Sequence, residues 1–300
     1  MYEDIDAEIV ELFGGYNFSK SLQVSSINEG GTIVSGQCKL DVGGPRFSIE
    51  AGQKKILLAD TTSTFTVNKI SITNEGRISG ELSMKTSDVS RLYVCAEDER
   101  QEPGRPIKSF GTIGAAYTTP SFSLDTNVDI VNGPTSRCSF VYNYKPWNVK
   151  IGTEVQINTH LDDNKARGAQ GGGLELENFN IGAAYRGPSY TISARTSDRL
   201  SSLSFGYFHQ VSKRVALGTL VNYGLNSNLQ SLSMGTSFSI DEDNSAKLKI
   251  NSAADLSGQL RHRINQWANL DIHAKVNLHQ ASVSNPKIGF GLVFDAESSQ

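Results

Sequence analysis

The sequence has no long apolar run, few charged residues and few cysteines. No apolar stretch approaches the roughly 18 residues that a membrane-spanning helix requires. Charged residues make up 20% of the chain, and the mean hydropathy is −0.31. These absences exclude a helical membrane protein. They leave a membrane β-barrel open, because the alternating strands of a barrel average to a polar hydropathy.

The three cysteines, Cys38, Cys95 and Cys138, lie far apart in the sequence. An odd number cannot all pair within one chain, so we expect reduced, structural thiols. The net charge of −3 is too small to indicate a nucleic-acid partner. The first residues, MYEDIDAEIVELF, are acidic and contain no basic-then-apolar leader, so we expect no secretory signal.

Residues 2–13 are the one segment with a clear helical pattern. Ile5, Ile9, Leu12 and Phe13 would share one face of a helix, and acidic residues fill most other positions. No basic residue occurs before Lys20. Two glycines follow the segment and predict its end.

From about residue 18 onward, apolar and polar residues alternate with a period of two, and turn residues recur at short intervals. The strand lengths cluster near the roughly 9–11 residues that cross a bilayer at a tilt. Clear examples are residues 122–130, 147–157, 215–223, 232–240 and 270–278.

The polar faces of these strands carry ionisable residues at mid-strand, and ionised groups there require water. The pattern therefore predicts a transmembrane antiparallel β-barrel with an aqueous lumen, built from about 19 or 20 strands. The count depends on whether residues 51–72 form one strand and a loop or two strands. We expect a helix in 1–15, inside or at the mouth of the pore, a barrel in 16–296 and a tail in 297–300. A soluble all-β binding or adhesion protein is the alternative, but it would have to bury these charges.

Signals for catalysis or metal binding are weak. Residues 168–173 read GAQGGG without a surrounding strand-to-helix pattern, which predicts a loop and not a phosphate site. His273 and His279 match no common metal-ligand spacing. We therefore expect no catalytic residues, no metal and no cofactor.

The stretch NPKIGFGLVF, residues 285–294, has bulky residues on one face of a strand and little on the other. With the helix and the alternating strands before it, this closing strand resembles those of the mitochondrial porin superfamily. Lys287, Gly289, Leu292 and Phe294 are similar to the family's sorting signal: a polar residue, a glycine and two hydrophobic residues. The resemblance implies a barrel in the lipid bilayer of the mitochondrial outer membrane, or of the corresponding membrane of a related organelle.

Two branches of the superfamily fit. Five stretches resemble the channel subunit of the outer-membrane protein translocase, the TOM complex: YEDI at residues 2–5, ELF at 11–13, NFSKSLQVSS at 17–26, NEGRISGELSMKTSDVSRLYVCA at 74–96 and KIGFGL at 287–292. That resemblance implies import of unfolded precursor proteins with basic presequences. It also implies small single-helix subunits, receptors and an oligomer of barrels as partners. The alternative is the voltage-dependent anion channel, which passes metabolites and nucleotides. We favour the translocase channel, because the helix of the anion channel has basic residues and this helix has none.

Strand parity predicts two sets of charged residues on the inner wall, and the helix has an apolar face that we expect to pack against that wall. The acidic set would attract basic presequences. The basic set would aid anion passage or pair with the acidic helix. The acidic set is Glu50, Glu81, Asp125, Asp129 and Glu154; the basic set is Lys247, Lys249, Arg261, Arg263 and Lys275; the apolar helix face is Ile5, Ile9 and Leu12.

Overall fold

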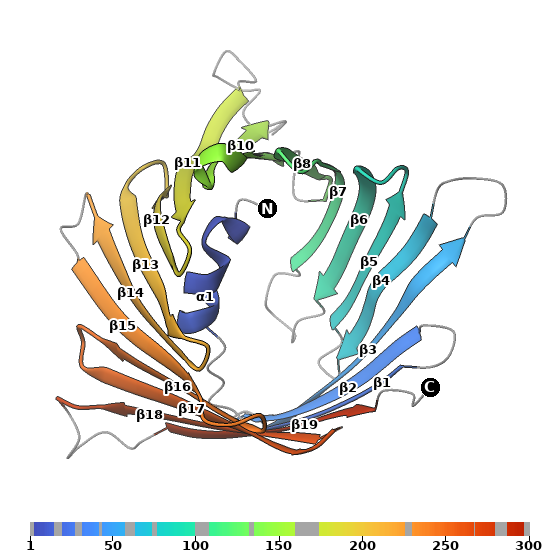
Figure 1. Ribbon diagram of the computed structural model, residues 1–300. Helices are drawn as coiled ribbons and strands as arrows, with labels where there is room; N and C mark the ends of the chain where they lie inside the picture. Colours follow the sequence, from blue (N-terminus) through green and yellow to red (C-terminus); the bar gives the residue numbers. More distant parts are fainter. Residues whose placement is uncertain are drawn as a thin grey trace, which may run out of the picture.

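The computed structural model describes residues 3–14, 20–27, 32–41, 44–57, 64–73, 77–99, 108–131, 135–159, 174–225, 230–266, 268–279 and 287–296. These form a 19-stranded sheet that closes into a barrel around a short helical segment (Figure 1). The elements are η1 (Glu3–Asp6), α1 (Ala7–Phe13), β1 (Lys20–Ile27), β2 (Thr32–Asp41), β3 (Gly44–Leu57), β4 (Thr64–Thr73), β5 (Arg77–Lys85), β6 (Ser90–Glu99), β7 (Lys108–Thr118), β8 (Phe122–Asp129), β9 (Thr135–Tyr144), η2 (Lys145–Trp147), β10 (Val149–Thr159), β11 (Leu174–Arg186), β12 (Tyr190–Ser197), β13 (Ser202–Ser212), β14 (Val215–Gly224), β15 (Gln230–Ser239), β16 (Asn244–Asn251), β17 (Asp255–Asn265), β18 (Ala268–Asn277) and β19 (Lys287–Ala296).

Each strand pairs antiparallel with the next, and β1 pairs parallel with β19 to close the sheet. The closing pair is parallel because an odd number of alternating strands leaves the first and the last running the same way. Leu22 lies opposite Leu292 at this seam. Closure leaves no open sheet edge, so the backbone polar groups of the strands can be satisfied within lipid.

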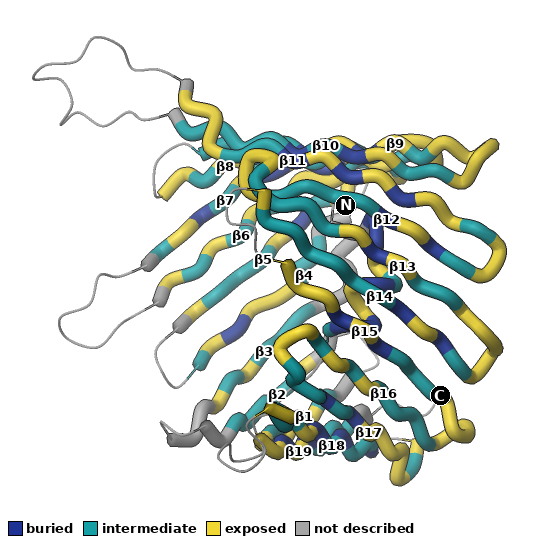
Figure 2. The backbone as a smooth tube through the Cα atoms, turned by 90° about the vertical axis from the view of Figure 1, so that its left-hand side faces the viewer, coloured by how far each residue is buried: buried dark blue, intermediate teal, exposed yellow. Residues whose placement is uncertain are grey.

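The alternation of side chains separates an outer face from an inner face. Ser193 of β12 hydrogen-bonds Asp6 of the enclosed helix, which identifies its side of the strand as the inner face. The adjacent position, Ile192, lies opposite Tyr207 of β13, and both are exposed on the outside. Exposed and less exposed positions alternate along the strands in Figure 2.

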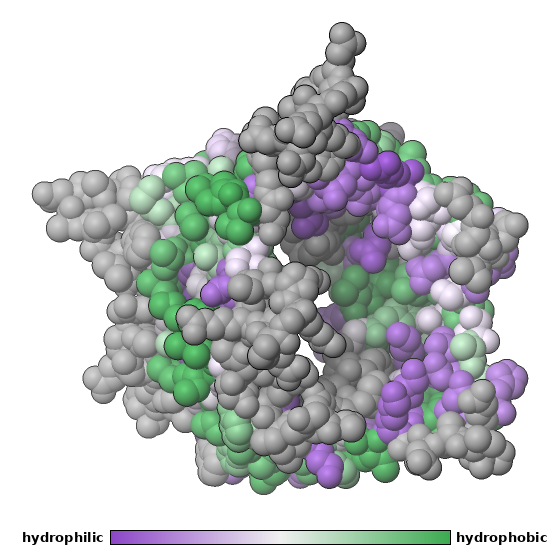
Figure 3. Space-filling model, turned by 180° about the vertical axis from the view of Figure 1, so that it is seen from behind, coloured by the Kyte–Doolittle hydropathy of each residue, from purple (hydrophilic) through white to green (hydrophobic). Residues whose placement is uncertain are grey.

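Many large apolar side chains point outward, among them Ile49 and Ile113, which are 63% and 50% exposed. An exposed apolar surface of this extent marks a surface that contacts lipid or a partner. Much of the outer wall at the left of Figure 3 is hydrophobic, and hydrophilic residues gather beside the opening. Within the described ranges, no helix is long and apolar enough to span a bilayer.

The structure confirms the predicted all-β transmembrane barrel with a short N-terminal helix, and its described residues form 19 strands. The uncertain stretch, residues 51–72, is divided between the end of β3 and most of β4, with residues 58–63 outside the described part.

Two predicted boundaries are wrong. Trp147 does not begin a strand but ends the η2 turn, because Pro146 cannot donate to a sheet ladder and Asn148 adopts a left-handed conformation with φ 52°. The helix, expected over 2–13, is a 3-10 turn as far as Asp6. The Asp6 side chain makes no capping hydrogen bond and contacts the barrel wall instead.

Replacing Ile113, at the centre of β7, with arginine should destabilise the barrel by about 2–4 kcal/mol, because the new charge would lie against acyl chains. Its neighbour Thr112 faces the lumen, so Thr112→Arg is the matched control and should have little effect. Urea unfolding in lipid vesicles, followed by tryptophan fluorescence, measures both. Equal losses would contradict the assignment of the two faces.

Candidate functional site: the lumen and its acidic helix

The helical segment lies inside the barrel along one side of the lumen (Figure 1). Its first turn, η1, contacts β10, β11 and β12, and α1 contacts β13, β14 and β15. The acidic segment is therefore placed against the part of the wall that β10–β15 form.

The apolar face of α1 packs on inward-facing glycines. Ile9 is 1% exposed and Leu12 is 3% exposed. A Cβ added at Gly206 of β13 would lie 2.5 Å from Ile9 Cδ1, and one added at Gly235 of β15 would lie 3.0 Å from Phe13 Cε1. Gly218 of β14 occupies the equivalent place beneath Leu12. These three glycines form a track, the glycine track, that admits the helix close to the wall.

The first turn packs separately. Ile5 is buried in a small cluster with Val141 of β9 and Ala184 of β11. Phe208 and Leu220 pack beside the larger cluster of Ile9, Leu12 and Phe13. The structure thus places Ile5, Ile9 and Leu12 at the contact between the helix and the wall.

The acidic side chains of the helix pair with basic side chains of the wall. Arg195 Nη1 of β12 lies 3.4 Å from Asp6 Oδ1, and Ser193 Oγ donates to Asp6 Oδ2 at 3.4 Å. Asp6 is 2% exposed. Because an unpaired buried carboxylate would be costly, Arg195 is the contact that makes this burial tolerable.

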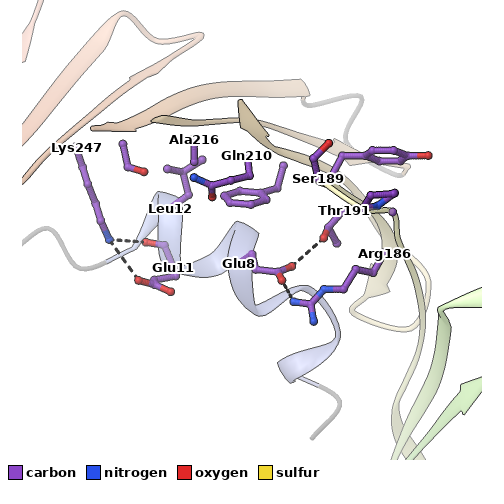
Figure 4. A pocket seen from close by; sticks show the side chains of 14 residues that line it. Glu8, Glu11, Leu12, Arg186, Ser189, Thr191, Gln210, Ala216 and Lys247 are labelled. Carbon is purple, nitrogen blue, oxygen red and sulfur yellow. Dashed lines mark hydrogen bonds and ion pairs between the residues drawn. The ribbon is translucent and has the colours of Figure 1, made fainter. Parts of the chain in front are cut away.

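Two further carboxylates extend this pairing on either side of a cavity of about 440 Å³ (Figure 4). Glu8 forms an ion pair with Arg186 of β11 and accepts a hydrogen bond from Thr191 Oγ1 at 2.9 Å. Glu11 lies 3.9 Å from Lys247 Nζ of β16. The latter pair is the more exposed of the two, so water screens it more strongly.

Two lysines of β16 contact the C-terminal end of α1. Lys249 Nζ donates to the Phe13 carbonyl at 3.4 Å and lies 5.7 Å from the centre of the Phe13 ring. Lys247 Nζ donates to the Glu11 carbonyl at 3.2 Å. Cations stabilise the negative end of a helix and the face of an aromatic ring.

The predicted acidic set lies on the inner face by register and contacts other wall residues. Lys69 Nζ of β4 forms an ion pair with Glu50 Oε1 at 2.7 Å, and Asn68 Nδ2 donates to Glu81 Oε1 at 2.7 Å. The inward positions follow from the pairing of β2–β5 and β7–β11.

The remaining acids have partners as well. Tyr93 Oη donates to Asp125 Oδ1 at 2.8 Å. Asp129 accepts from the Val131 backbone N–H at 2.9 Å. Arg137 Nη2 lies 2.6 Å from Glu154 Oε2, and Glu154 is 6% exposed. These carboxylates are therefore occupied by contacts within the wall.

The predicted basic set divides into two groups. Lys247 and Lys249 contact the helix, as described above. Arg261 donates to both carboxylate oxygens of Asp271, at 2.7 and 3.1 Å, and Lys275 lies 3.0 Å from Asp255. Arg263 Nε donates to the Asn265 carbonyl at 3.3 Å.

Sequence reasoning did not single out Arg186 and Arg195, the two arginines that pair with the helix. Both stand at polar positions of alternating strands. A polar position in an alternating strand does not by itself distinguish these arginines from other side chains that face the aqueous lumen. Their pairing depends on where the helix lies, which the strand pattern does not show.

A closed barrel with an apolar outer face, a charged inner face and a helix within the lumen defines a transmembrane pore protein. The chain belongs to the eukaryotic porin family, whose sequence model matches residues 2–289. The matched family is one of channels.

Individual porins are similar over much of the chain. The chain is 23% identical to mitochondrial outer membrane protein porin 1 of Arabidopsis thaliana over 84% of its length and 98% of that protein. It is 22% identical to the porin of 36 kDa of Solanum tuberosum, over 77% and 88%. It is 25% identical to porin 2 of Oryza sativa subsp. japonica, over 63% of this chain and 62% of that protein.

These findings confirm the porin family and the predicted location in the mitochondrial outer membrane. They do not support the branch that the sequence motifs favoured, because the relatives are porins and not translocase subunits. Motifs such as KIGFGL are therefore insufficient to separate the two branches.

Replacing Gly206 with valine should displace the helix, because the added Cβ would lie 2.5 Å from Ile9 and 2.8 Å from Ser193 Oγ. A spin label on Ala7→Cys, in a background without other cysteines, should become more mobile. Gly80→Val is the matched control, since nothing lies within 4 Å of a Cβ there. An unchanged spectrum for Gly206→Val would show that the glycine track does not hold the helix.

Arg195→Gln should loosen the helix, because it leaves the buried Asp6 carboxylate without its cation. In a double-mutant cycle with Asp6→Asn, read from the mobile fraction of the same spin label, we expect a coupling energy of roughly 1–3 kcal/mol. Strictly additive effects would mean that the two side chains do not stabilise each other.

Proposed function

We propose that the protein is an anion-conducting porin of the voltage-dependent anion channel type, passing metabolites and nucleotides through the barrel. The observation that carries this proposal is a row of lysines on the inner wall. Lys249, Ser257, Lys275 and Lys287 are successive register partners on β16, β17, β18 and β19.

Neighbouring strands lie roughly 4.8 Å apart, so this lysine row is a compact strip of positive charge. Only Lys275 has a carboxylate partner within the described part of the chain, Asp255. Like charges on directly opposed positions, such as Lys275 and Lys287, oppose folding. Their presence on a wetted wall supports a role toward anions in the lumen.

The acidic helix offsets only part of the positive potential of the lysine row. Three of its five carboxylates are already paired with Arg186, Arg195 and Lys247 of the wall. The lysine row continues beyond that contact onto β18 and β19. Because the surrounding lipid has a low dielectric, the field of unmatched wall charges is concentrated in the aqueous lumen.

A protein-conducting channel has less support. It requires acidic wall groups that a basic presequence could contact in succession. Glu50 and Glu154 are instead paired with Lys69 and Arg137, and among the described residues no structural feature favours import. Precursor proteins and translocase subunits are therefore not proposed as partners.

Recording from planar bilayers tests the proposal. Under a salt gradient, the reversal potential should indicate a preference for chloride over potassium, and the conductance should fall at high voltage of either sign. A preference for potassium together with block by a basic presequence peptide would overturn the proposal in favour of the translocase channel.

Lys287→Glu should lower the chloride-to-potassium permeability ratio by at least about twofold, because it reverses one charge in the lysine row. The protein should be refolded in vitro, so that any effect of Lys287 on membrane assembly is kept out of the measurement. Lys20→Glu is the matched control, since Lys20 is exposed on the outer face of β1 by register with Phe290. Equal shifts in the two variants would contradict a local role of the row.

A further inference from the structure

One rim of the barrel has aromatic side chains around part of its outer face. The turns β7–β8, β9–β10, β11–β12 and β13–β14 all lie at this rim, because alternate turns of an up-and-down sheet share an end. Aromatic rings follow one another beside these turns. The contacts are Tyr117–Phe122 at 5.6 Å, Tyr142–Tyr144 at 6.4 Å and Tyr185–Tyr190 at 5.8 Å between ring centroids.

Two further aromatic pairs at this rim include a polar or an exposed ring. Tyr207 stacks on His209 at 6.1 Å, and Tyr207 Oη lies 3.1 Å from His209 Nδ1. Trp147, in the β9–β10 turn, packs edge-on against Tyr144 at 5.5 Å and is 70% exposed. Tyrosine and tryptophan rings of this kind are typical of the level of lipid headgroups.

The charges on these four turns have one sign. Lys145, Lys213 and Arg214 are exposed, and residues 119–121, 145–148, 187–189 and 213–214 contain no acidic residue. The next turn at the same rim, β15–β16, contains three acidic residues, 241–243. Hydrogen bonding from Asn244 lowers the pKa of Asp241, which keeps that turn anionic. The basic charges thus coincide with the tyrosine and tryptophan rings, and the acidic turn comes next along the rim.

We propose that this part of the rim, the basic aromatic arc, binds anionic phospholipid headgroups. Lys145, Lys213 and Arg214 would contact the lipid phosphate, and the tyrosine rings beneath them would pack along the glycerol and the upper acyl chains. Each basic residue near an anionic lipid surface contributes about fivefold to binding. The arc would therefore concentrate anionic lipid along one side of the barrel. The acidic residues 241–243 would repel anionic lipid from the β15–β16 turn. Headgroup binding at this rim does not depend on which solute passes through the lumen.

Fluorescence quenching by brominated lipids tests the proposal. In a Trp267→Phe variant, Trp147 is the single tryptophan and reports the lipid beside Lys145. A second sensor, Tyr207→Trp in a Trp147→Phe/Trp267→Phe background, reports the lipid beside Lys213 and Arg214. The protein is reconstituted in phosphatidylcholine vesicles that contain a small fraction of brominated phosphatidylglycerol or of brominated phosphatidylcholine.

At equal lipid fractions, the anionic lipid should quench both sensors several-fold more effectively. Lys145→Gln should abolish the preference for anionic lipid at the first sensor, and Lys213→Gln/Arg214→Gln should abolish it at the second. Quenching by brominated phosphatidylcholine should stay unchanged, which verifies that the variants are inserted. Lys20→Gln, which removes a charge near the other rim, is the matched control and should leave both preferences intact.

Equal quenching by both lipids at the two sensors would overturn the proposal. So would a preference that survives removal of the three basic side chains.

Discussion

Closure of the sheet, combined with the period-two alternation of its side chains, is the constraint on which the rest of the structure depends. The seam between β1 and β19 removes the last open edge, so the strands can lie in lipid with their backbone groups paired. Because the outer face contacts acyl chains, the ionised residues lie on the inner face, where they require water. Ion pairs such as Lys69–Glu50 and Arg137–Glu154 then cross between neighbouring strands of a hydrated wall.

The enclosed helix depends on the same wall in two ways. Glycines at inward positions of β13, β14 and β15 let Ile9, Leu12 and Phe13 reach the backbone, and cations on β11, β12 and β16 pair with three of the five carboxylates of the helix. The helix therefore adds less negative charge to the lumen than its acidic residues would alone. The lysine row on β16–β19 would then make the potential positive along its side of the pore, which would connect the packing of the helix to the proposed preference for anions.

Local patterns in the sequence predict the barrel, the strand positions such as 215–223 and the apolar face of the helix, because each follows from the spacing of neighbouring residues. Contacts between distant residues do not follow in this way. Arg195 and Asp6 are 189 residues apart in the chain, and nothing near either residue identifies the other. The acids predicted to attract presequences, such as Glu154, are paired through a strand register that periodicity leaves undefined. Short motifs favour the translocase branch of the superfamily, whereas similarity over most of the chain points to the porins.

Thiol accessibility along β8 tests most directly whether one face of each strand meets water and the other meets lipid. Single cysteines at Leu124, Asp125, Thr126, Asn127 and Val128, in a background without Cys38, Cys95 and Cys138, would be labelled in vesicles with a membrane-impermeant maleimide. Labelling should alternate, with rapid reaction at 125 and 127 and protection at 124, 126 and 128. Uniform labelling, or rapid labelling at 124, 126 and 128 alone, would contradict a water-filled barrel with a lipid-facing exterior.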